Sequence, residues 1–256
     1  MHGSRELVTD VLKGRLGFDG LVVSDWNGIQ QVPGCAKDHC PQAVNAGIDL
    51  TMVPDDWKAF IANTAADVRE GRIAMTRIDD AVTRILRVKL RAGLFDHSPV
   101  ASTFAGKAGA LDARELAREA VRKSAVLLKN QGVLPLTPGK RVLVVGASAD
   151  SLSNQTGGWS LTWQGRANTN PDSPNADTIL AGIRDAPGKD NVTFSADAKD
   201  VDVSKFDAVV AVIGERPYAE GDGDIGPNGT LRHSGRYPED LAVLQAVAGK
   251  GKPVVT

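Results

Sequence analysis

Residues 17–28, GFDGLVVSDWNG, join a short apolar run to a carboxylate and an indole ring. The run over 21–24 predicts a strand, and its apolar character is typical of a parallel sheet that is buried on both faces. Ligands of parallel α/β proteins bind at the carboxyl ends of the strands, which is where Asp25 lies. Asp25 is therefore a candidate functional residue. The alternative is a turn or helix-cap residue, because Asp is common at both positions.

The rest of the first hundred residues alternates helical patterns with apolar segments. A second buried strand is expected over 47–54, and helices are expected over 4–15, 41–46, 57–70 and 75–95. Helices that alternate with short apolar strands are typical of proteins with a parallel sheet. We therefore predict the α/β class for this part of the chain.

The segment over 75–95 carries the clearest helix signals. Its apolar residues recur at helical spacing on one face. Thr76 is expected to cap the first turn, with Asp79 reaching back to it, and Gly93 follows the last turn.

The second half of the chain begins with a predicted linker. Ser, Ala, Gly and Pro recur over 96–110 without periodicity, and a helix over 112–129 and a turn-rich connector over 132–140 are expected to follow. From 141 onward the pattern predicts a second α/β unit with a polar loop over 147–174. Its other expected elements are, in chain order, a strand over 141–145, a helix near 175–185, strands over 192–196 and 206–213, a helix over 238–249 and a strand over 253–256.

The composition of the 256 residues excludes several classes of function. A hydrophobic content of 42% suffices for one large domain or two smaller ones, and 30 basic against 31 acidic side chains give a net charge of −1. Because no segment concentrates Lys or Arg, we expect no binding to nucleic acid or to an anionic membrane. No apolar stretch approaches the ~18 residues of a membrane span.

The cysteine pair and the two ends of the chain also carry information. For Cys35 and Cys40, in CAKDHC, we expect a free pair or a small disulfide, and a disulfide indicates an oxidising compartment. A zinc site that includes His39 is the weaker alternative, because no further Cys/His pair completes it.

The chain begins on a helical pattern and ends inside an apolar run, so we expect it to be part of a larger protein.

Several long motifs resemble those of glycoside hydrolase family 3, most closely its exo-1,3/1,4-β-glucanases and β-glucosidases. They are, in chain order, LVTDVLKGRLGFDGLVVSDWNGI, QAVNAGIDLTMVPDDW, RIDDAVTRILRVKLRAGLF, AREAVRKSAVLLKNQGVLPL, GGWSLTWQG and GERPYAEGDGD. The resemblance covers essentially the whole chain in the family's order. It implies that residues 1–95 are the C-terminal part of a TIM-like (β/α)8 barrel, that 96–140 link two domains through a helix, and that 141–256 are the first part of an α/β sandwich domain.

The resemblance also implies an active site with two carboxyl groups. Asp25, in the SDW motif, matches the family's catalytic nucleophile, and Glu220, the last residue of GERPYAE, matches its acid/base residue. Glu215 of the same motif is an equal candidate by position alone, and only the resemblance favours Glu220.

Tryptophan rings are the expected sugar contacts, because sugars present apolar C–H faces that pack on aromatic rings. Trp26 and Trp163 match the two rings that grip the sugar in the family. Trp159, the first ring of GGWSLTWQG, is expected to be a structural core ring instead.

Together these matches imply a retaining, exo-acting β-glucosidase or β-glucan glucohydrolase that works through a covalent glycosyl-enzyme intermediate. The implied substrate is a β-glucoside or a β-glucan oligosaccharide, with no cofactor and no metal. Two alternatives stay open: a β-N-acetylhexosaminidase of the same family, against which the GERPYAE motif counts, and a non-catalytic sugar-binding or inactive piece. Relatives imply a periplasmic or secreted parent, although no signal-peptide pattern follows Met1.

Overall fold

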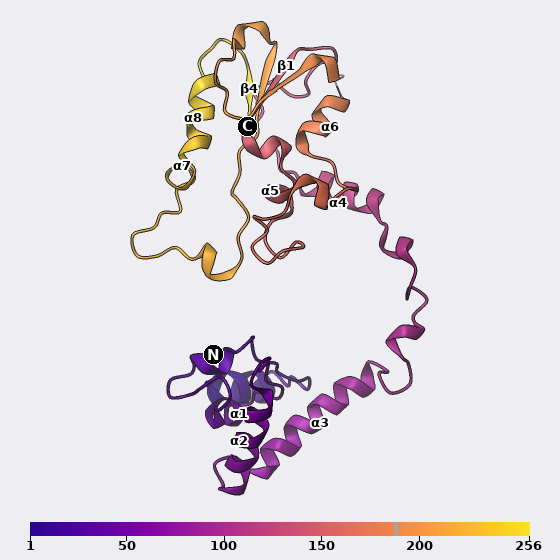
Figure 1. Ribbon diagram of the computed structural model, residues 1–256, viewed down its shortest axis with the longest axis vertical. Helices are drawn as coiled ribbons and strands as arrows, with labels where there is room; N and C mark the ends of the chain where they lie inside the picture. Colours follow the sequence, from indigo (N-terminus) through magenta and orange to yellow (C-terminus); the bar gives the residue numbers. More distant parts are fainter. Residues whose placement is uncertain (187–188) are drawn as a thin grey trace. The chain divides into compact units, whose positions relative to one another are not determined.

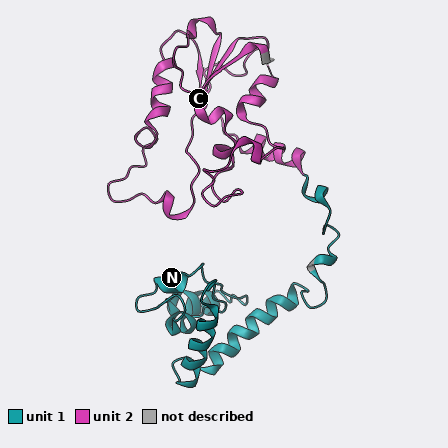
Figure 2. Ribbon diagram, viewed as in Figure 1, with its two compact units in different colours: residues 1–112 teal, residues 113–256 magenta. Residues whose placement is uncertain are grey.

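The structure, a computed structural model, describes residues 1–186 and 189–256 and divides them into two compact units, Met1–Asp112 and Ala113–Thr256 (Figure 2). Each unit has a hydrophobic core of its own. The second unit contains the more regular architecture.

Among the described residues, the second unit forms a four-stranded parallel sheet (Figure 1). Its strands, in the spatial order β2-β1-β3-β4, are β1 (Val142–Val145), β2 (Val192–Ser195), β3 (Ala208–Ala211) and β4 (Val254–Val255). In the central strand, Val142 lies opposite Val192 on one side and Ala208 on the other. The strands predicted over 141–145, 192–196, 206–213 and 253–256 are confirmed, and so is the parallel α/β class.

The side chains of a strand alternate between the two faces of a sheet. Because the strands carry apolar residues on both faces, each face packs against a helix. All of β1 is buried. Its odd-numbered residues lie in one cluster with α8 (Pro238–Val247), and its even-numbered residues lie in another with Leu180 of α6 (Ile179–Asp185). Figure 1 shows α6 and α8 on opposite sides of the strands. Both helices confirm predicted ones.

Gly146 ends β1 where no larger residue fits. Its φ of +97° is a conformation that only glycine adopts easily, and a Cβ there would collide with the carbonyl oxygen of Val212. We expect Gly146→Ala to lower the free energy of unfolding of the second unit by about 2–3 kcal/mol, measured from the urea midpoint.

The matched control is Gly182→Ala, inside α6. Nothing lies within 4 Å of a Cβ added at Gly182, so this change stabilises the helix by up to about 1 kcal/mol. If both variants unfold at the same urea concentration, the close approach at Gly146 is contradicted.

α4 (Arg114–Ser124) is shorter than the helix predicted over 112–129. The helix ends because Ala125 adopts extended backbone, with φ −68° and ψ 127°. Its apolar residues are exposed, Leu116 at 67% and Val121 at 68%. Short helices are marginal without packing, so the apolar pattern alone does not extend the helix past Ser124.

Among the described residues, two short α-helices were not predicted. α5 (Leu152–Thr156) lies inside the segment expected to be a loop, and it begins where Ser151 Oγ accepts a hydrogen bond from Asn154 N over 3.2 Å. α7 (His233–Arg236) directly precedes α8. Both are too short for a periodic apolar pattern to indicate them.

The helices of the first unit follow the predictions closely. α1 (Pro41–Ala46), α2 (Trp57–Arg69) and α3 (Met75–Arg91) confirm three of them, and the helix expected over 4–15 forms as a π-helix over Glu6–Arg15. The predicted capping of α3 by Thr76 is wrong. Its N-cap residue is Ala74 and no side chain caps the helix, whereas Gly93, with φ +67°, follows its last turn as expected.

The two strand predictions of the first unit are wrong in extent, and of the apolar residues in the two segments only Ile48 and Val53 are buried. The segments 21–24 and 47–54 lie parallel, and Ser24 N donates to Leu50 O over 2.9 Å, but the pairing is a single bridge between Val23 and Leu50. Val23 is 46% exposed and Leu50 is 38% exposed. Within the described residues neither segment pairs with a further strand, so no neighbouring strand covers Val23 and Leu50.

The core of the first unit combines residues of the segment that follows Asp25 with residues of α1 and of the segment 47–54. Its buried members are Ile29, Val32, Cys40, Ala43, Ile48 and Val53. A disulfide joins Cys35 to Cys40, which decides between the free and the linked pair. His39, the residue considered as a metal ligand, contacts the buried carboxylate of Asp67 through Nε2 over 3.0 Å.

Candidate active site

The main chain of Asp25 is held at three points in the first unit. Asp25 N donates to His2 Nε2 over 3.0 Å, and Asp25 O accepts from Ser24 Oγ over 2.8 Å and from Gly28 N over 2.9 Å. Ser24 is buried, and its Oγ also accepts from Met52 N over 2.8 Å. The second apolar segment therefore fixes the residue that precedes Asp25.

The side chain of Asp25 is exposed beside an exposed indole ring. Its Oδ1 accepts a hydrogen bond from Trp26 N over 2.7 Å, and the Trp26 side chain is 65% exposed. Among the described residues, no hydrogen bond or ion pair engages the other carboxylate oxygen. One oxygen thus orients the carboxylate and the other is available to a ligand, as a nucleophile requires.

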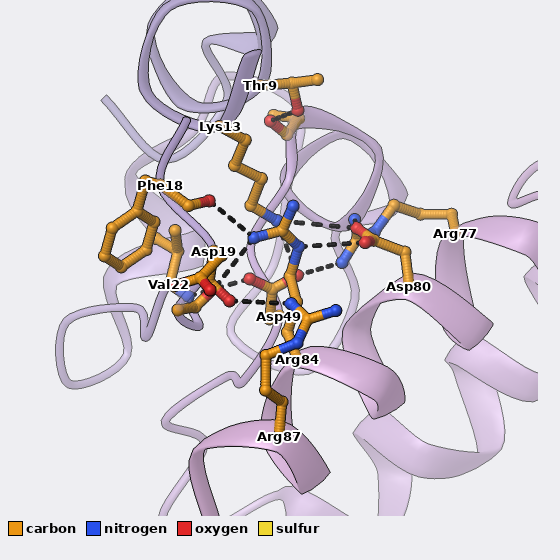
Figure 3. Close-up of polar contacts among 12 residues, drawn as sticks. Thr9, Lys13, Phe18, Asp19, Val22, Asp49, Arg77, Asp80, Arg84 and Arg87 are labelled. Atoms are coloured by element: carbon orange, nitrogen blue, oxygen red, sulfur yellow. Dashed lines mark hydrogen bonds and ion pairs between the residues drawn. The ribbon is translucent and has the colours of Figure 1, made fainter. Parts of the chain in front are cut away.

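A buried ion-pair cluster anchors the segment that leads to Asp25 (Figure 3). The fully buried side chain of Asp49 accepts from Val22 N over 2.8 Å and from Lys13 Nζ over 2.7 Å, and it pairs with Arg77 of α3. Asp49 therefore connects the N-terminal helix, both apolar segments and α3. Burial lowers the pKa of Lys13, although the hydrogen bond and the charge of Asp49 oppose this shift.

Arg84 of α3 extends the cluster to the loop before the first apolar segment. Its Nη1 donates to Phe18 O and Gly20 O, each over 2.9 Å, and its Nε pairs with Asp80 over 2.9 Å. Burial raises the pKa of Asp80, but the hydrogen bond from Arg84 and the charge of Arg77 outweigh it, so the pKa lies below its usual range. The Asp80 carboxylate, which belongs to α3, is thereby kept ionised.

Trp163 lies in the second unit on a tight loop over 159–163. Trp159 N donates to Trp163 O over 2.8 Å, and both Trp159 and Leu161 have positive φ, +62° and +60°. The two indole centroids lie 6.0 Å apart, and Trp163 is 55% exposed and Trp159 69% exposed. The prediction that Trp159 is a core ring is therefore wrong, because the closed loop turns both rings outward.

Glu220 begins a short 3₁₀ helix over Glu220–Gly223 and has a φ of +49°. Its carboxylate is exposed and has no hydrogen-bond or ion-pair partner in the described part of the chain. The preceding residue, Ala219, is buried, and its N donates to Gln164 Oε1 over 2.7 Å. Because Gln164 follows Trp163, the backbone that presents Glu220 is tied to the loop that presents Trp163.

Glu215, the alternative acid, already has two partners. Tyr218 OH donates to Glu215 Oε2 over 2.9 Å, and Arg236 Nη1 pairs with Glu215 Oε1 over 3.2 Å. A general acid needs a carboxyl group that can reach the substrate, so the geometry favours Glu220 over Glu215. The sequence motifs indicated neither Tyr218 nor Arg236 as a contributor, although Tyr218 lies within GERPYAE.

Two family profiles match the chain, one in each half. The profile of the glycosyl hydrolase family 3 N terminal domain matches residues 1–88. The profile of the glycosyl hydrolase family 3 C-terminal domain matches residues 125–256, which is more than half of the chain. The chain belongs to glycosyl hydrolase family 3.

This family 3 chain is similar to proteins named for β-glucoside hydrolysis. A lysosomal beta glucosidase of Dictyostelium discoideum is 35% identical over 100% of this chain, and a periplasmic beta-glucosidase of Salmonella typhimurium is 33% identical over 71% of it. Among solved structures, the exo-1,3/1,4-beta-glucanase of a Pseudoalteromonas species matches 100% of the chain with a TM-score of 0.88 at 46% identity.

The family 3 chain spans only part of these proteins. It covers 33% of the Dictyostelium relative, 24% of the Salmonella relative and 32% of the Pseudoalteromonas structure. Within the described residues, no helix has both the length and the apolar character needed to cross a membrane.

Proposed function

We propose that this family 3 chain supplies both catalytic carboxyl groups of a retaining, exo-acting β-glucosidase or β-glucan glucohydrolase. One observation carries the proposal: both halves of the family match within one chain, and each matched half holds one candidate carboxylate. Residues 1–88 include Asp25, and residues 125–256 include Glu220. The similarity to an exo-1,3/1,4-beta-glucanase at 46% identity supports the substrate class.

In the first chemical step, Asp25 attacks the anomeric carbon of the terminal sugar while Glu220 gives its proton to the glycosidic oxygen. The bond from the anomeric carbon to that oxygen breaks, and a bond to the carboxylate of Asp25 forms. In the second step Glu220 takes a proton from water, whose oxygen attacks the same carbon and releases Asp25. Two inversions leave the β configuration unchanged. This route requires the two carboxyl groups to lie roughly 5–5.5 Å apart in the working enzyme.

Trp26 and Trp163 are the proposed sugar contacts. Both rings are exposed, at 65% and 55%, and each lies on a loop that is closed by backbone hydrogen bonds. Rigid aromatic rings offer a large contact area to the C–H face of a sugar at little cost in entropy. In this proposal the two rings hold the sugar on the leaving-group side.

The proposed architecture follows the family. Residues 1–95 form the C-terminal part of a TIM-like (β/α)8 barrel, 96–140 link the domains, and 141–256 form the first part of an α/β sandwich domain. The parallel bridge between Val23 and Leu50 and the parallel sheet of the second unit support this assignment. Asp25 then lies at the carboxyl end of a barrel strand, where barrel enzymes carry their active sites.

The proposed compartment of the whole protein is the periplasm or the extracellular space. Two observations support it. The Salmonella relative is named a periplasmic enzyme, and the Cys35–Cys40 disulfide fits an oxidising compartment.

The test is covalent trapping with 2,4-dinitrophenyl 2-deoxy-2-fluoro-β-glucoside. Its fluorine slows both steps, and its good leaving group keeps the first step fast, so the glycosyl-enzyme accumulates. Because the chain covers only part of its relatives, the 256-residue chain is compared with a grafted enzyme. In the grafted enzyme, residues 1–256 replace the matching part of the Pseudoalteromonas exo-1,3/1,4-beta-glucanase. We expect peptide mass spectrometry of the grafted enzyme to find the fluoroglucosyl group on Asp25.

A label on another carboxylate contradicts the assignment of Asp25. A folded grafted enzyme that neither turns over β-glucosides nor becomes labelled contradicts the proposed function as a whole. Labelling of the 256-residue chain by itself would further show that residues 1–256 suffice to bind the sugar.

A further inference from the structure

The segment 214–219, which leads from β3 to Glu220, is held on one side by a polar cluster that we name the Glu215 brace. The brace consists of Glu215, Tyr218 and Arg236. Tyr218 OH donates to one oxygen of Glu215 over 2.9 Å, and Arg236 donates to the other over 3.2 Å. Both oxygens of this carboxylate are therefore occupied within the brace.

Arg236 connects the brace to α7. Its guanidinium lies over the ring of Tyr218, 5.5 Å from the centroid, and over the ring of Tyr237 at 5.6 Å. The Arg236 side chain is 23% exposed, and Tyr237 is buried. Partial burial between two aromatic rings limits the positions that the guanidinium can adopt, so Glu215 has a well-defined partner.

Asp240 of α8 holds the beginning of the same segment. The buried carboxylate accepts from Gly214 N over 3.3 Å and contacts His233 Nε2 over 2.7 Å. His233 belongs to α7, so Asp240 and the Glu215 brace tie the segment to the same pair of helices.

The opposite side of the segment contacts the loop that carries Trp163. Gln164 Oε1 accepts from Ala219 N over 2.7 Å, and Arg166 Nε donates to Pro217 O over 3.3 Å. Pro217 and Ala219 are both buried. The segment is thus fixed on two sides up to the residue before Glu220, whose own carboxylate is exposed.

We propose that Glu215 is a positioning residue that holds the segment 214–219 so that Glu220 can deliver its proton to the glycosidic oxygen. This inference rests on the proposed function, in which Glu220 is the acid/base residue. Glu215 itself transfers no proton in the reaction. When Glu215 is removed, Tyr218 and Arg236 lose their common acceptor, and on the side of α7 and α8 the segment keeps only the contact of Gly214 N with Asp240.

The test uses the different proton demands of two substrates. A β-1,3-linked glucose disaccharide has a poor leaving group and needs proton donation, whereas 2,4-dinitrophenolate leaves without it. In the grafted enzyme we expect Glu215→Ala to lower kcat/KM for the disaccharide about 100-fold and for the dinitrophenyl glucoside less than about 3-fold. Glu215→Gln keeps an acceptor oxygen, and we expect it to recover most of the disaccharide rate.

The matched control is Arg216→Ala, in the neighbouring position. Its side chain is 68% exposed and pairs with Glu239 over 2.7 Å, outside the brace. We expect less than about a 2-fold change with either substrate. If Glu215→Ala slows both substrates equally, or slows neither, the positioning role is contradicted.

Two further variants keep the outcome decisive. If Glu215→Ala does not fold, as judged by circular dichroism, Tyr218→Phe takes its place, because it removes only the hydroxyl donor and keeps the ring beneath Arg236. We expect Tyr218→Phe to lower kcat/KM less than Glu215→Ala does, and again more for the disaccharide than for the dinitrophenyl glucoside. An equal effect on the two substrates contradicts the positioning role. Glu220→Ala separates the two proposals. If kcat/KM of this variant falls by the same factor for both substrates, the acid/base assignment of Glu220 is contradicted, whatever the result for Glu215→Ala.

Discussion

Replacing Asp25 by glycine in the grafted enzyme is expected to lower kcat/KM for the dinitrophenyl glucoside by at least about 10³-fold, which corresponds to about 4 kcal/mol in the barrier. The covalent intermediate cannot form without the carboxylate, even when the leaving group needs no proton. The glycine also leaves space on the face of the sugar that Asp25 attacks. Added azide is expected to enter there and to restore turnover in a single displacement.

The product of this rescue identifies the role of each carboxylate. One displacement by azide inverts the anomeric centre, so Asp25→Gly is expected to yield the α-glucosyl azide. In Glu220→Ala, Asp25 still forms the intermediate and azide replaces water in the second step, so two inversions yield the β-glucosyl azide. Nuclear magnetic resonance of the products distinguishes the two anomers.

The control for these variants is Asp19→Asn, in the same segment. Asp19 pairs with Arg91 in an ion pair whose side chains are both 59% exposed, and we expect unchanged kinetics. Exchanged products, with the β-azide from Asp25→Gly and the α-azide from Glu220→Ala, would mean that the two roles are reversed. Full activity of Asp25→Gly without azide would remove Asp25 from the mechanism.

Local patterns were sufficient to predict elements that are stabilised within their own unit. The four strands that the described residues of the second unit form, and the helices α6 and α8, agree with prediction, because β1 is buried between the two helices within the same unit. The apolar segments at 21–24 and 47–54 carry an equally strong pattern. They form only one bridge, because the described residues contain no neighbouring strands for them. An apolar pattern indicates a capacity for burial, and burial itself needs a partner.

For the candidate site, too, the sequence indicated some features and not others. Asp25 and Glu220 were identified through motifs, and Asp25 also through its position after an apolar run. The contacts that hold them were not identified, because His2, Gln164, Arg236 and Asp240 lie far from these residues in sequence or outside the motifs. Trp159 was misassigned because its outward orientation depends on positive φ values at 159 and 161, which no residue type there indicates.

Asp49→Ala is expected to have the largest effect on the stability of the first unit. It leaves the Lys13 ammonium, 5% exposed, and the Arg77 guanidinium, 13% exposed, with Asp80 as their remaining carboxylate, 3.8 Å from Lys13 Nζ, and it removes the acceptor of Val22 N. Breaking one side of a buried ion pair costs about 3–5 kcal/mol. The measurement is urea unfolding of the 256-residue chain, with hydrogen exchange of peptides from the Glu6–Arg15 helix and α3 to locate the loss. Asp19→Asn, on an exposed pair, is the control and should leave both readouts unchanged.

The pH dependence of the Asp49→Ala defect tests its cause. Burial already lowers the pKa of Lys13, and the variant removes the hydrogen bond and the charge of Asp49 that raise it. The folded variant therefore releases the Lys13 proton at a lower pH than the unfolded chain, where the lysine pKa is about 10.4. Between these two values the unfolded chain holds more protons, so stability rises with pH. We expect the difference from the wild type to shrink as the pH rises toward the lysine pKa of the unfolded chain, because the wild-type lysine keeps the hydrogen bond and charge that raise its pKa. A difference that stays constant would assign the lost stability to Arg77 and to the backbone amide of Val22 instead of the buried ammonium group.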